Sequence, residues 1–324
     1  MIAITSSLPF PSQSIIREDI IPLSGNSWEH FQPSPFLTDL YLGYRNVPSQ
    51  KIHHISRLDQ RTIFDVIYTH DKFGNRISPA LPPSSGHKFL ALLGCSFVYG
   101  EGLSDQQTLP YHLARISPQF HYYNFGIIGS GPHMDLNRIQ RGVLRKEIQE
   151  DEGIFIYVFL QFHVNRAKGY LPDLEYLQDS PYYEVDQEGA IKWQGSFKQG
   201  RPHVTQILLA LSRFISSFPK LANREFPKIT EKDVRKVCSM IKASQMTLAQ
   251  QFPKSKFIVY NHPFSIMSSS MRTCLNRNHL TLISGHFLIS PHYKLPDNHP
   301  SSAANEEIAK ELSARVLKNL NYEF

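Results

Sequence analysis

Residues 88–102, KFLALLGCSFVYGEG, constrain the fold of this chain more than any other stretch. The apolar run at 89–93 starts after a basic residue and stops at Gly94, which is typical of a short strand buried on both faces of a parallel sheet. Ser96 follows the end of this strand. Because ligands of open parallel sheets bind outside the carboxyl ends of the strands, Ser96 stands where a catalytic side chain is expected.

The segment around this serine, GCSFVYGEGLSDQQTLPYHL, resembles the first conserved block of the SGNH, or GDSL, hydrolases, which are serine esterases and acyl-transfer enzymes. The resemblance implies that Ser96 is the nucleophile. Cys95 stands where most members of that family carry aspartate, and it is the rival nucleophile. The G-x-S-x-G elbow of the α/β-hydrolases fits less well, because Val98 occupies its fifth position.

Two later segments resemble further blocks of the same family. The sequence NFGIIG matches N-x-G-x-x-G, which implies that Gly129 contributes an oxyanion-hole amide. The apolar run at 154–160 predicts a strand buried on both faces at the centre of the sheet. The family normally presents an asparagine after this strand as the other oxyanion donor. Here His163 matches that position and Asn165 comes two residues later, so both are candidates.

The general base is expected near the C-terminal end of the sequence. Asp297 and His299 precede a segment with apolar residues at helical spacing, and they resemble the fifth block of the family with D-x-H spacing. The resemblance implies that His299 is the base and that Asp297 is its carboxylate partner. His262, which follows a predicted strand at 256–260, is the alternative base. A metal site is disfavoured because no third ligand is spaced with the D-x-H pair, and no cofactor is expected.

Composition excludes several classes of protein. With 41% hydrophobic and 19% charged residues, the chain of 324 residues should be globular rather than disordered. The net charge of +6 comes without a dense run of Lys and Arg, so we expect no nucleic-acid partner. No signal peptide and no transmembrane segment stand out, which favours a cytoplasmic location. Cys95, Cys238 and Cys274 are widely spaced and odd in number, which argues against a disulfide framework and fits a reducing compartment.

We therefore expect a three-layer α/β/α domain with a parallel, flavodoxin-like sheet over residues 87–324, carrying a helical insertion at about 167–255. Residues 1–86 are expected to form an N-terminal arm and a small, irregular β-rich appendage. Members of the resembling subgroup often carry a Y-x-x-D-x-x-G-x-R piece before the nucleophile block. Here that piece comprises Tyr68, Asp71, Gly74 and Arg76.

The expected function is that of a serine esterase or deacylase. It would hydrolyse acyl or acetyl esters of a small molecule or a glycan through a Ser-His-Asp triad and an acyl-enzyme. An acyltransferase with the same site is the nearest alternative, and a non-catalytic carbohydrate- or lipid-binding module is another. The sequence does not predict an oligomeric state.

Overall fold

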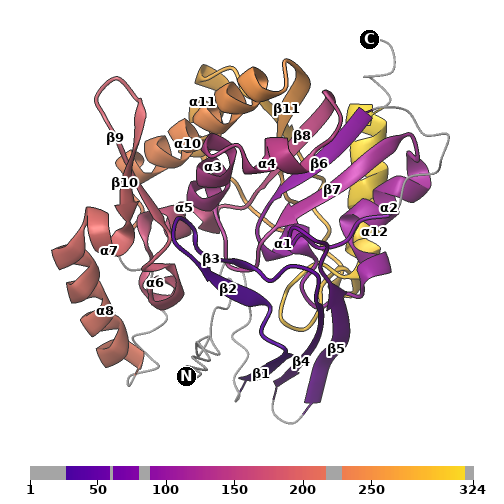
Figure 1. The fold of residues 1–324 in the computed structure, drawn as a ribbon, viewed down its shortest axis with the longest axis horizontal. Helices are drawn as coiled ribbons and strands as arrows, with labels where there is room; N and C mark the ends of the chain where they lie inside the picture. Colours follow the sequence, from indigo (N-terminus) through magenta and orange to yellow (C-terminus); the bar gives the residue numbers. More distant parts are fainter. Residues whose placement is uncertain (1–26, 59–60, 80–87, 217–227, 318–324) are drawn as a thin grey trace.

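A five-stranded parallel sheet forms the centre of the protein (Figure 1). The computed structural model describes residues 27–58, 61–79, 88–216 and 228–317. The sheet consists of β6 (Lys88–Gly94), β7 (Phe120–Gly126), β8 (Glu152–Phe159), β11 (Lys254–Asn261) and β12 (Thr281–Ser284). Its spatial order is β12-β11-β8-β6-β7, and every neighbouring pair is parallel. Counted along the chain this is the flavodoxin-like order 2-1-3-4-5, so the predicted fold class is confirmed.

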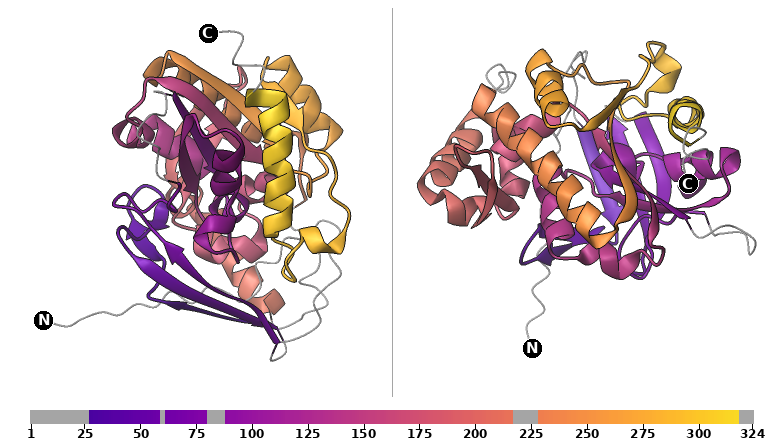
Figure 2. Two further views of the ribbon diagram at one scale, coloured as in Figure 1. Left: turned by 90° about the vertical axis from the view of Figure 1, so that its right-hand side faces the viewer. Right: turned by 90° about the horizontal axis from the view of Figure 1, so that it is seen from above.

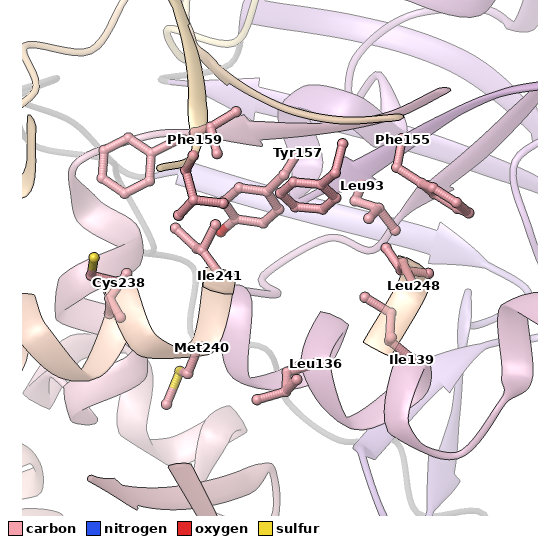
Figure 3. Close-up of a cluster of buried hydrophobic side chains, with 14 of the residues drawn as sticks. Leu93, Leu136, Ile139, Phe155, Tyr157, Phe159, Cys238, Met240, Ile241 and Leu248 are labelled. Carbon is pink, nitrogen blue, oxygen red and sulfur yellow. The ribbon is translucent and has the colours of Figure 1, made fainter. Parts of the chain in front are cut away.

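The central strands β6 and β8 are apolar after their first residues, Lys88 and Glu152, because both of their faces are covered. Alternate side chains of β8 point to opposite faces of the sheet. Phe155 and Tyr157 belong to one buried cluster, part of which Figure 3 shows, and Ile156 and Val158 belong to the cluster on the other face. Burial of this kind contributes about 25 cal/mol for each Å² of apolar surface removed from water.

Helices cover the two faces of the sheet. The face that carries Tyr157 is covered mainly by α3 (Pro132–Gln140), α4 (Val143–Glu147), α5 (Phe162–Lys168), α10 (Glu231–Gln251) and α11 (Ser269–Arg277). The opposite face is covered by α2 (Leu109–Ile116) and α12 (Ser302–Leu312), which pack against each other. Figure 2 shows α10 and α12 on opposite sides of the sheet. No helix in the described part of the chain is both long and apolar enough to cross a membrane.

The N-terminal region is a separate antiparallel layer. It contains a three-stranded sheet of β1 (Ser27–Gln32), β4 (Lys51–Leu58) and β5 (Arg61–Thr69), and a hairpin of β2 (Phe36–Asp39) and β3 (Gly43–Asn46). Buried side chains of this layer, among them Tyr44, Ile52 and Tyr68, pack on Tyr99 and Ile127 at the carboxyl edge of the main sheet. This agrees with the predicted β-rich character, while most of the predicted proline-rich arm lies outside the described residues.

After α5, the connection between β8 and β11 has two parts, a mixed segment of short helices and a hairpin followed by one long helix. Its first part comprises α6 (Leu171–Leu177), β9 (Pro181–Val185), β10 (Ile191–Ser196), α7 (Phe197–Gly200) and α8 (Pro202–Ser216). Its last part is α10, which begins after the capping residue Thr230 and buries Val237 and Ile241 in the core of the sheet face. The domain limits stay a prediction, but α10 belongs to the α/β/α layers rather than to the insertion predicted at 167–255.

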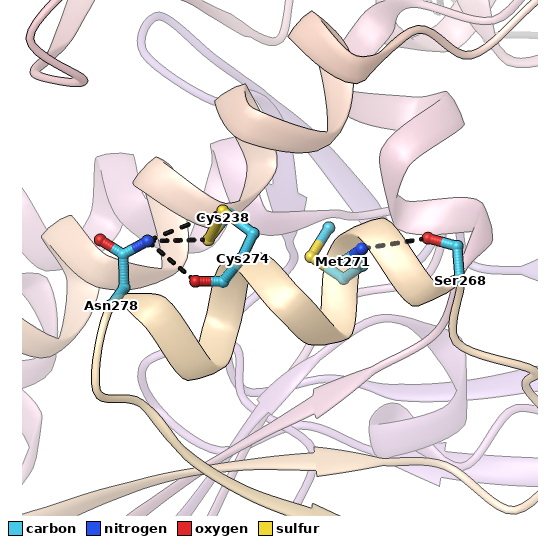
Figure 4. The surroundings of a disulfide bond; sticks show 5 residues. All are labelled: Cys238, Ser268, Met271, Cys274 and Asn278. Atoms are coloured by element: carbon cyan, nitrogen blue, oxygen red, sulfur yellow. Dashed lines mark hydrogen bonds between the residues drawn. A yellow bond between two sulfur atoms is a disulfide. The ribbon is translucent and has the colours of Figure 1, made fainter.

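Two of the cysteines are bonded, contrary to the sequence-based expectation. Cys238 in α10 and Cys274 in α11 form a disulfide, with their Cα atoms 6.3 Å apart (Figure 4). The Asn278 amide donates to the Cys274 carbonyl at 2.9 Å and closes the end of α11. The expectation was wrong because a separation of 36 residues in sequence does not reveal that α10 and α11 pack together. Cysteine usage therefore no longer supports a reducing compartment, and the cytoplasmic location stays a prediction.

Candidate active site

The structure brings Ser96, His299 and Asp297 together at the carboxyl edge of the sheet. Ser96 begins the single-turn helix α1 (Ser96–Tyr99), directly after β6. Its Oγ lies 2.9 Å from Nε2 of His299, and Nδ1 of His299 lies 2.9 Å from Oδ2 of Asp297. The other carboxylate oxygen of Asp297 accepts the backbone N–H of His299 at 3.1 Å. The short D-x-H spacing therefore allows one carboxylate to hold both the ring and the backbone of the histidine.

A tight turn presents these two residues to the serine. Asn298, between them, has a left-handed backbone with φ = 70°. Such a conformation is tolerated by asparagine better than by most residues. The backbone N–H of Leu295 donates to the His299 carbonyl at 2.8 Å and closes the turn. Helix α12 starts soon afterwards, with the Ser301 hydroxyl accepting from the backbone of Ala304, so the turn is anchored to the helical layer.

The surroundings of the Asp–His pair shift the pKa values of both members towards their charged forms. Burial alone would lower the pKa of His299, but the Asp297 and Glu101 carboxylates outweigh it and hold that pKa well above its ordinary value. Burial likewise opposes ionisation of Asp297, but His299 holds the pKa of the carboxyl below its ordinary value. An imidazole in this setting binds a proton strongly.

A second carboxylate lies at the site and was missed by the sequence analysis. Oε2 of the buried Glu101 is 3.2 Å from Nε2 of His299, the same nitrogen that faces Ser96. Glu101 lies between Gly100 and Gly102, which both have positive φ values, of 83° and 78°. The G-E-G sequence within the nucleophile block is the only signal that could have indicated it, because glycines on both sides allow the backbone to turn a charged side chain inward.

A buried arginine fixes the loop that carries Glu101. The Arg76 guanidinium donates to the carbonyls of Tyr99, Gly100 and Leu103, at 3.3, 3.2 and 2.6 Å. Its Nε pairs with Asp105 at 2.7 Å. Five donors in one rigid fork are suited to holding several carbonyls at once. Arg76, predicted in the Y-x-x-D-x-x-G-x-R piece, thus organises the segment that follows Ser96.

The N-terminal sheet also contacts this loop. The Tyr68 hydroxyl accepts the backbone N–H of Gly102 at 2.8 Å and lies 2.8 Å from Nδ1 of His54. Burial lowers the pKa of His54 to about 3, so its ring is neutral.

Asp71, in the Y-x-x-D-x-x-G-x-R piece, has a local role, since its carboxylate accepts from the backbone of Asn75 and closes a turn.

The residues of the second block shape the opposite side of the site. The Asn124 amide donates to the Val98 carbonyl at 2.9 Å, and its oxygen accepts the backbone N–H of Gly126 at 3.0 Å. A Cβ on Gly126 would lie 2.2 Å from the backbone nitrogen of Tyr99, so only glycine lets α1 approach this closely. Gly129 has a φ of 77°. A Cβ there would meet the Tyr44 hydroxyl oxygen at 2.7 Å.

The two candidates of the third block lie in α5, and no hydrogen bond among the described residues joins either of them to Ser96. Nδ1 of His163 lies 2.8 Å from the Tyr157 hydroxyl and also accepts the backbone N–H of Leu160, which leaves the proton on Nε2. This Nε2 and the Oδ1 of Asn165 are buried, with no hydrogen-bond partner in the described ranges. Burial holds the pKa of His163 well below its ordinary value, so the ring is neutral.

The alternative nucleophile and the alternative base lie elsewhere. Cys95 is fully buried, and its side chain belongs to the apolar cluster under α2 and α12. His262 is also buried, and its Nδ1 accepts the backbone N–H of Phe264 at 3.1 Å. Burial lowers the pKa of His262 to about 3. Within the described ranges, no group of three or more His, Cys, Asp or Glu side chains is arranged to hold a metal ion.

The fold and these side chains define an α/β/α domain with a serine placed for activation by a histidine. No protein-family model matches the chain, and no curated protein matches it in sequence. Similar solved structures include the acetyl xylan esterase Est2A from Butyrivibrio proteoclasticus. It is 12% identical, with a TM-score of 0.44, and the match covers 74% of this chain and 66% of that enzyme.

Two further solved structures are similar to this chain at a comparable level. One is a carbohydrate esterase family 2 enzyme from Myceliophthora fergusii, with 11% identity, a TM-score of 0.40 and coverage of 80% of this chain and 72% of that chain. The other is a putative lipolytic protein of the G-D-S-L family from Desulfitobacterium hafniense, with 11% identity, a TM-score of 0.38 and coverage of 71% and 99%. Likenesses of this size do not assign a function, which must come from the geometry of the site.

Proposed function

We propose that this protein is a serine esterase or deacylase that cleaves acyl or acetyl esters through an acyl-enzyme on Ser96. The observation that carries the proposal is the continuous line of contacts from Ser96 Oγ through His299 to Asp297, each 2.9 Å long. A hydroxyl is a weak nucleophile at neutral pH and needs a base within hydrogen-bond reach to remove its proton as it attacks. His299 is such a base, and Asp297 would hold its ring in the required tautomer.

In the proposed reaction, Ser96 Oγ bonds to the ester carbonyl carbon while its proton moves to Nε2 of His299. The carbon–oxygen bond to the alcohol then breaks, and the alcohol leaves with the proton from Nε2. Water, which loses a proton to Nε2 of His299, then bonds to the acyl carbon. The bond from that carbon to Ser96 Oγ breaks, Oγ takes the proton back from Nε2, and the carboxylic acid leaves. The imidazolium formed in each half is stabilised by Asp297, which lies against Nδ1.

The oxyanion is proposed to be held by the backbone N–H groups of Ser96 and Gly129. The Ser96 amide stands at the open start of α1, where the first N–H groups of a helix have no partner inside the helix. The third donor is proposed to be His163 or Asn165. In favour of His163, its proton is on Nε2, which has no hydrogen-bond partner among the described residues. Each donor of this kind contributes about 10²–10³ in kcat.

The substrate is proposed to be an acyl or acetyl ester of a small molecule or a glycan. An acyltransferase would share the same acyl-enzyme and differ only in the acceptor that attacks it. A carbohydrate- or lipid-binding module does not need a base hydrogen-bonded to a serine, and the Ser96–His299 contact therefore favours an enzyme.

Labelling with a fluorophosphonate and turnover of p-nitrophenyl acetate test the proposal. The wild-type protein should be labelled and active, and Ser96→Ala should lose both properties while keeping the circular dichroism spectrum of the wild type. Ser104→Ala is a matched control, because Ser104 is exposed and lies in the loop that follows α1. Absence of labelling and turnover in the wild-type protein would support the binding module instead. Full activity in Ser96→Ala with loss in Cys95→Ala would assign the nucleophile to the cysteine.

A further inference from the structure

His299 lies between two carboxylates rather than beside one. Asp297 is 2.9 Å from Nδ1, and Glu101 is 3.2 Å from Nε2. A neutral imidazole has a single N–H and can donate to only one of them, whereas an imidazolium donates to both. The arrangement therefore favours the protonated ring. Glu101 acts on Nε2, and Nε2 must lose its own proton before it can accept the proton of Ser96.

The position of Glu101 is built into the backbone. Its own N–H donates to the Ser96 carbonyl at 3.1 Å, and the next N–H, of Gly102, donates to the Tyr68 hydroxyl at 2.8 Å. On the other side, Arg76 holds the carbonyls of Gly100 and Leu103. A buried carboxylate is costly without a partner, and the charged partner that the structure records for Glu101 is His299.

No other group that faces the His299 ring offsets the negative charge of Glu101 among the described residues. Asp297 approaches from the same turn, and Ser96 and Glu101 approach from α1 and the loop after it. Phe97, also from α1, presents an apolar ring with its centroid 5.3 Å from that of the imidazole. From the N-terminal sheet, the charge of His299 is felt by His54, which is neutral because it is buried.

We propose that Glu101 is a positioning residue of this site, whose carboxylate accepts the Nε2–H of the His299 imidazolium and sets the pH below which His299 cannot act as a base. The inference rests on the proposed function. When Ser96 attacks, its proton arrives on Nε2 and is shared with Glu101 until the leaving alcohol takes it up. Glu101 thus stabilises the protonated intermediate, and the cost is that the resting enzyme is inactive at low pH.

The test is an NMR titration of the His299 ring in the wild-type protein and in Glu101→Gln, which keeps the shape of the side chain and removes its charge. The His299 signal is identified by its absence in His299→Gln. The pKa of His299 should fall by about one to three units in Glu101→Gln, as expected for the loss of an opposite charge in contact with the ring. With p-nitrophenyl acetate, the acidic limb of the kcat/KM profile should move to lower pH by the same amount.

Asp105→Asn is the matched control, because it disturbs the same loop by removing the partner of Arg76 without removing a charge that contacts His299. It should leave the His299 titration where it is. If Glu101→Gln does not fold, Glu101→Asp withdraws the carboxylate by one methylene and should give a smaller fall in the same direction. An unchanged titration in the folded variants would overturn the inference.

The two proposals fail in different ways. The titration needs no turnover, so a shifted pKa in a protein without esterase activity would reject the proposed function and leave the coupling of Glu101 to His299 in place. Turnover that depends on Ser96, with a His299 titration unaffected by Glu101, would support the proposed function and reject the coupling of Glu101 to His299. A purely structural role for Glu101 would lower kcat in Glu101→Gln without moving the acidic limb, and that outcome also overturns the inference.

Discussion

Mild acid should destabilise this protein, because at least five of its described histidines, His163 among them, are buried in neutral form. Burial lowers the pKa values of His54, His133 and His262 to about 3 and that of His70 to about 4. In the unfolded chain these rings have ordinary pKa values of about 6.5. As the pH falls below that value, the unfolded chain binds protons that the folded protein does not, so the free energy of unfolding decreases.

The size of the effect follows from 1.36 kcal/mol for each unit of pKa difference. At pH 5, His54, His70, His133 and His262 each cost about 2 kcal/mol relative to pH 7, or about 8 kcal/mol together. The lowered pKa of the buried His163 adds to the loss in the same direction. Burial also raises the pKa of Asp173, which opposes this loss. Asp135 and Glu147 oppose it measurably, because burial raises their pKa values to about 6 and about 7. They take up protons on folding and restore about 4 kcal/mol.

Two groups of the candidate site do not change this balance near pH 5. The pKa of His299 is raised on folding, so its contribution is fully present below about pH 6.5 and is lost only as the pH rises through the folded value. The pKa of Asp297 is lowered, so its contribution is lost only at more acid pH. A net loss of about 4 kcal/mol at pH 5 is a large part of a total stability of about 5–15 kcal/mol.

Urea unfolding followed by circular dichroism at pH 7, 6 and 5 measures the loss. The sharpest variant is His133→Leu, because neither ring nitrogen of His133 has a hydrogen-bond partner in the described part of the chain. It should lose about 2 kcal/mol less than the wild type between pH 7 and pH 5. His203→Asn, at an exposed position of α8, should behave like the wild type. A stability that does not change over this pH range, or an equal loss in His133→Leu, would refute the reasoning.

Two further predictions concern the disulfide and the third block. Replacing Cys238 and Cys274 together by alanine should lower the free energy of unfolding by about 3–4 kcal/mol, because the bond closes a loop between residues 36 apart. Urea unfolding with and without reductant measures this, and the idea fails if reductant destabilises the double variant as much as the wild type. If His163 donates to the oxyanion, His163→Ala should lower kcat by about 10²–10³ with little change in KM, and His163→Asn should keep much of the activity. Because the ring of His163 is neutral, it should add no ionisation to the pH profile. Equal kcat values in all three proteins would leave the oxyanion to the backbone amides and to Asn165.

Much of the main sheet could be predicted because the relevant signals are local. The apolar runs at 89–93 and 154–160 are short and continuous, which is what a strand buried on both faces requires, and they became β6 and β8. The position of Ser96 at the end of β6 follows from the same pattern. Asp297 and His299 are two residues apart, so their hydrogen bond also depends mainly on local geometry.

Other features could not be predicted, because they depend on how distant segments pack. Ser96 and His299 are 203 residues apart, and only the resemblance to a known family suggested that they meet. The disulfide requires α10 and α11 to lie side by side, and the periodicity of each helix reports only which of its own faces is apolar.

The amino-acid sequence by itself determined the central strands, the serine at the end of one of them and the Asp–His pair before the last helix. The tertiary structure alone decided the surroundings of that pair. The N-terminal layer packs on the carboxyl edge of the sheet, where Arg76 and Tyr68 hold the loop after α1 and turn Glu101 toward His299. The physical reason is that a buried charge is stable only beside partners that offset the cost of removing it from water. Those partners come together only when separate layers of the fold pack against each other.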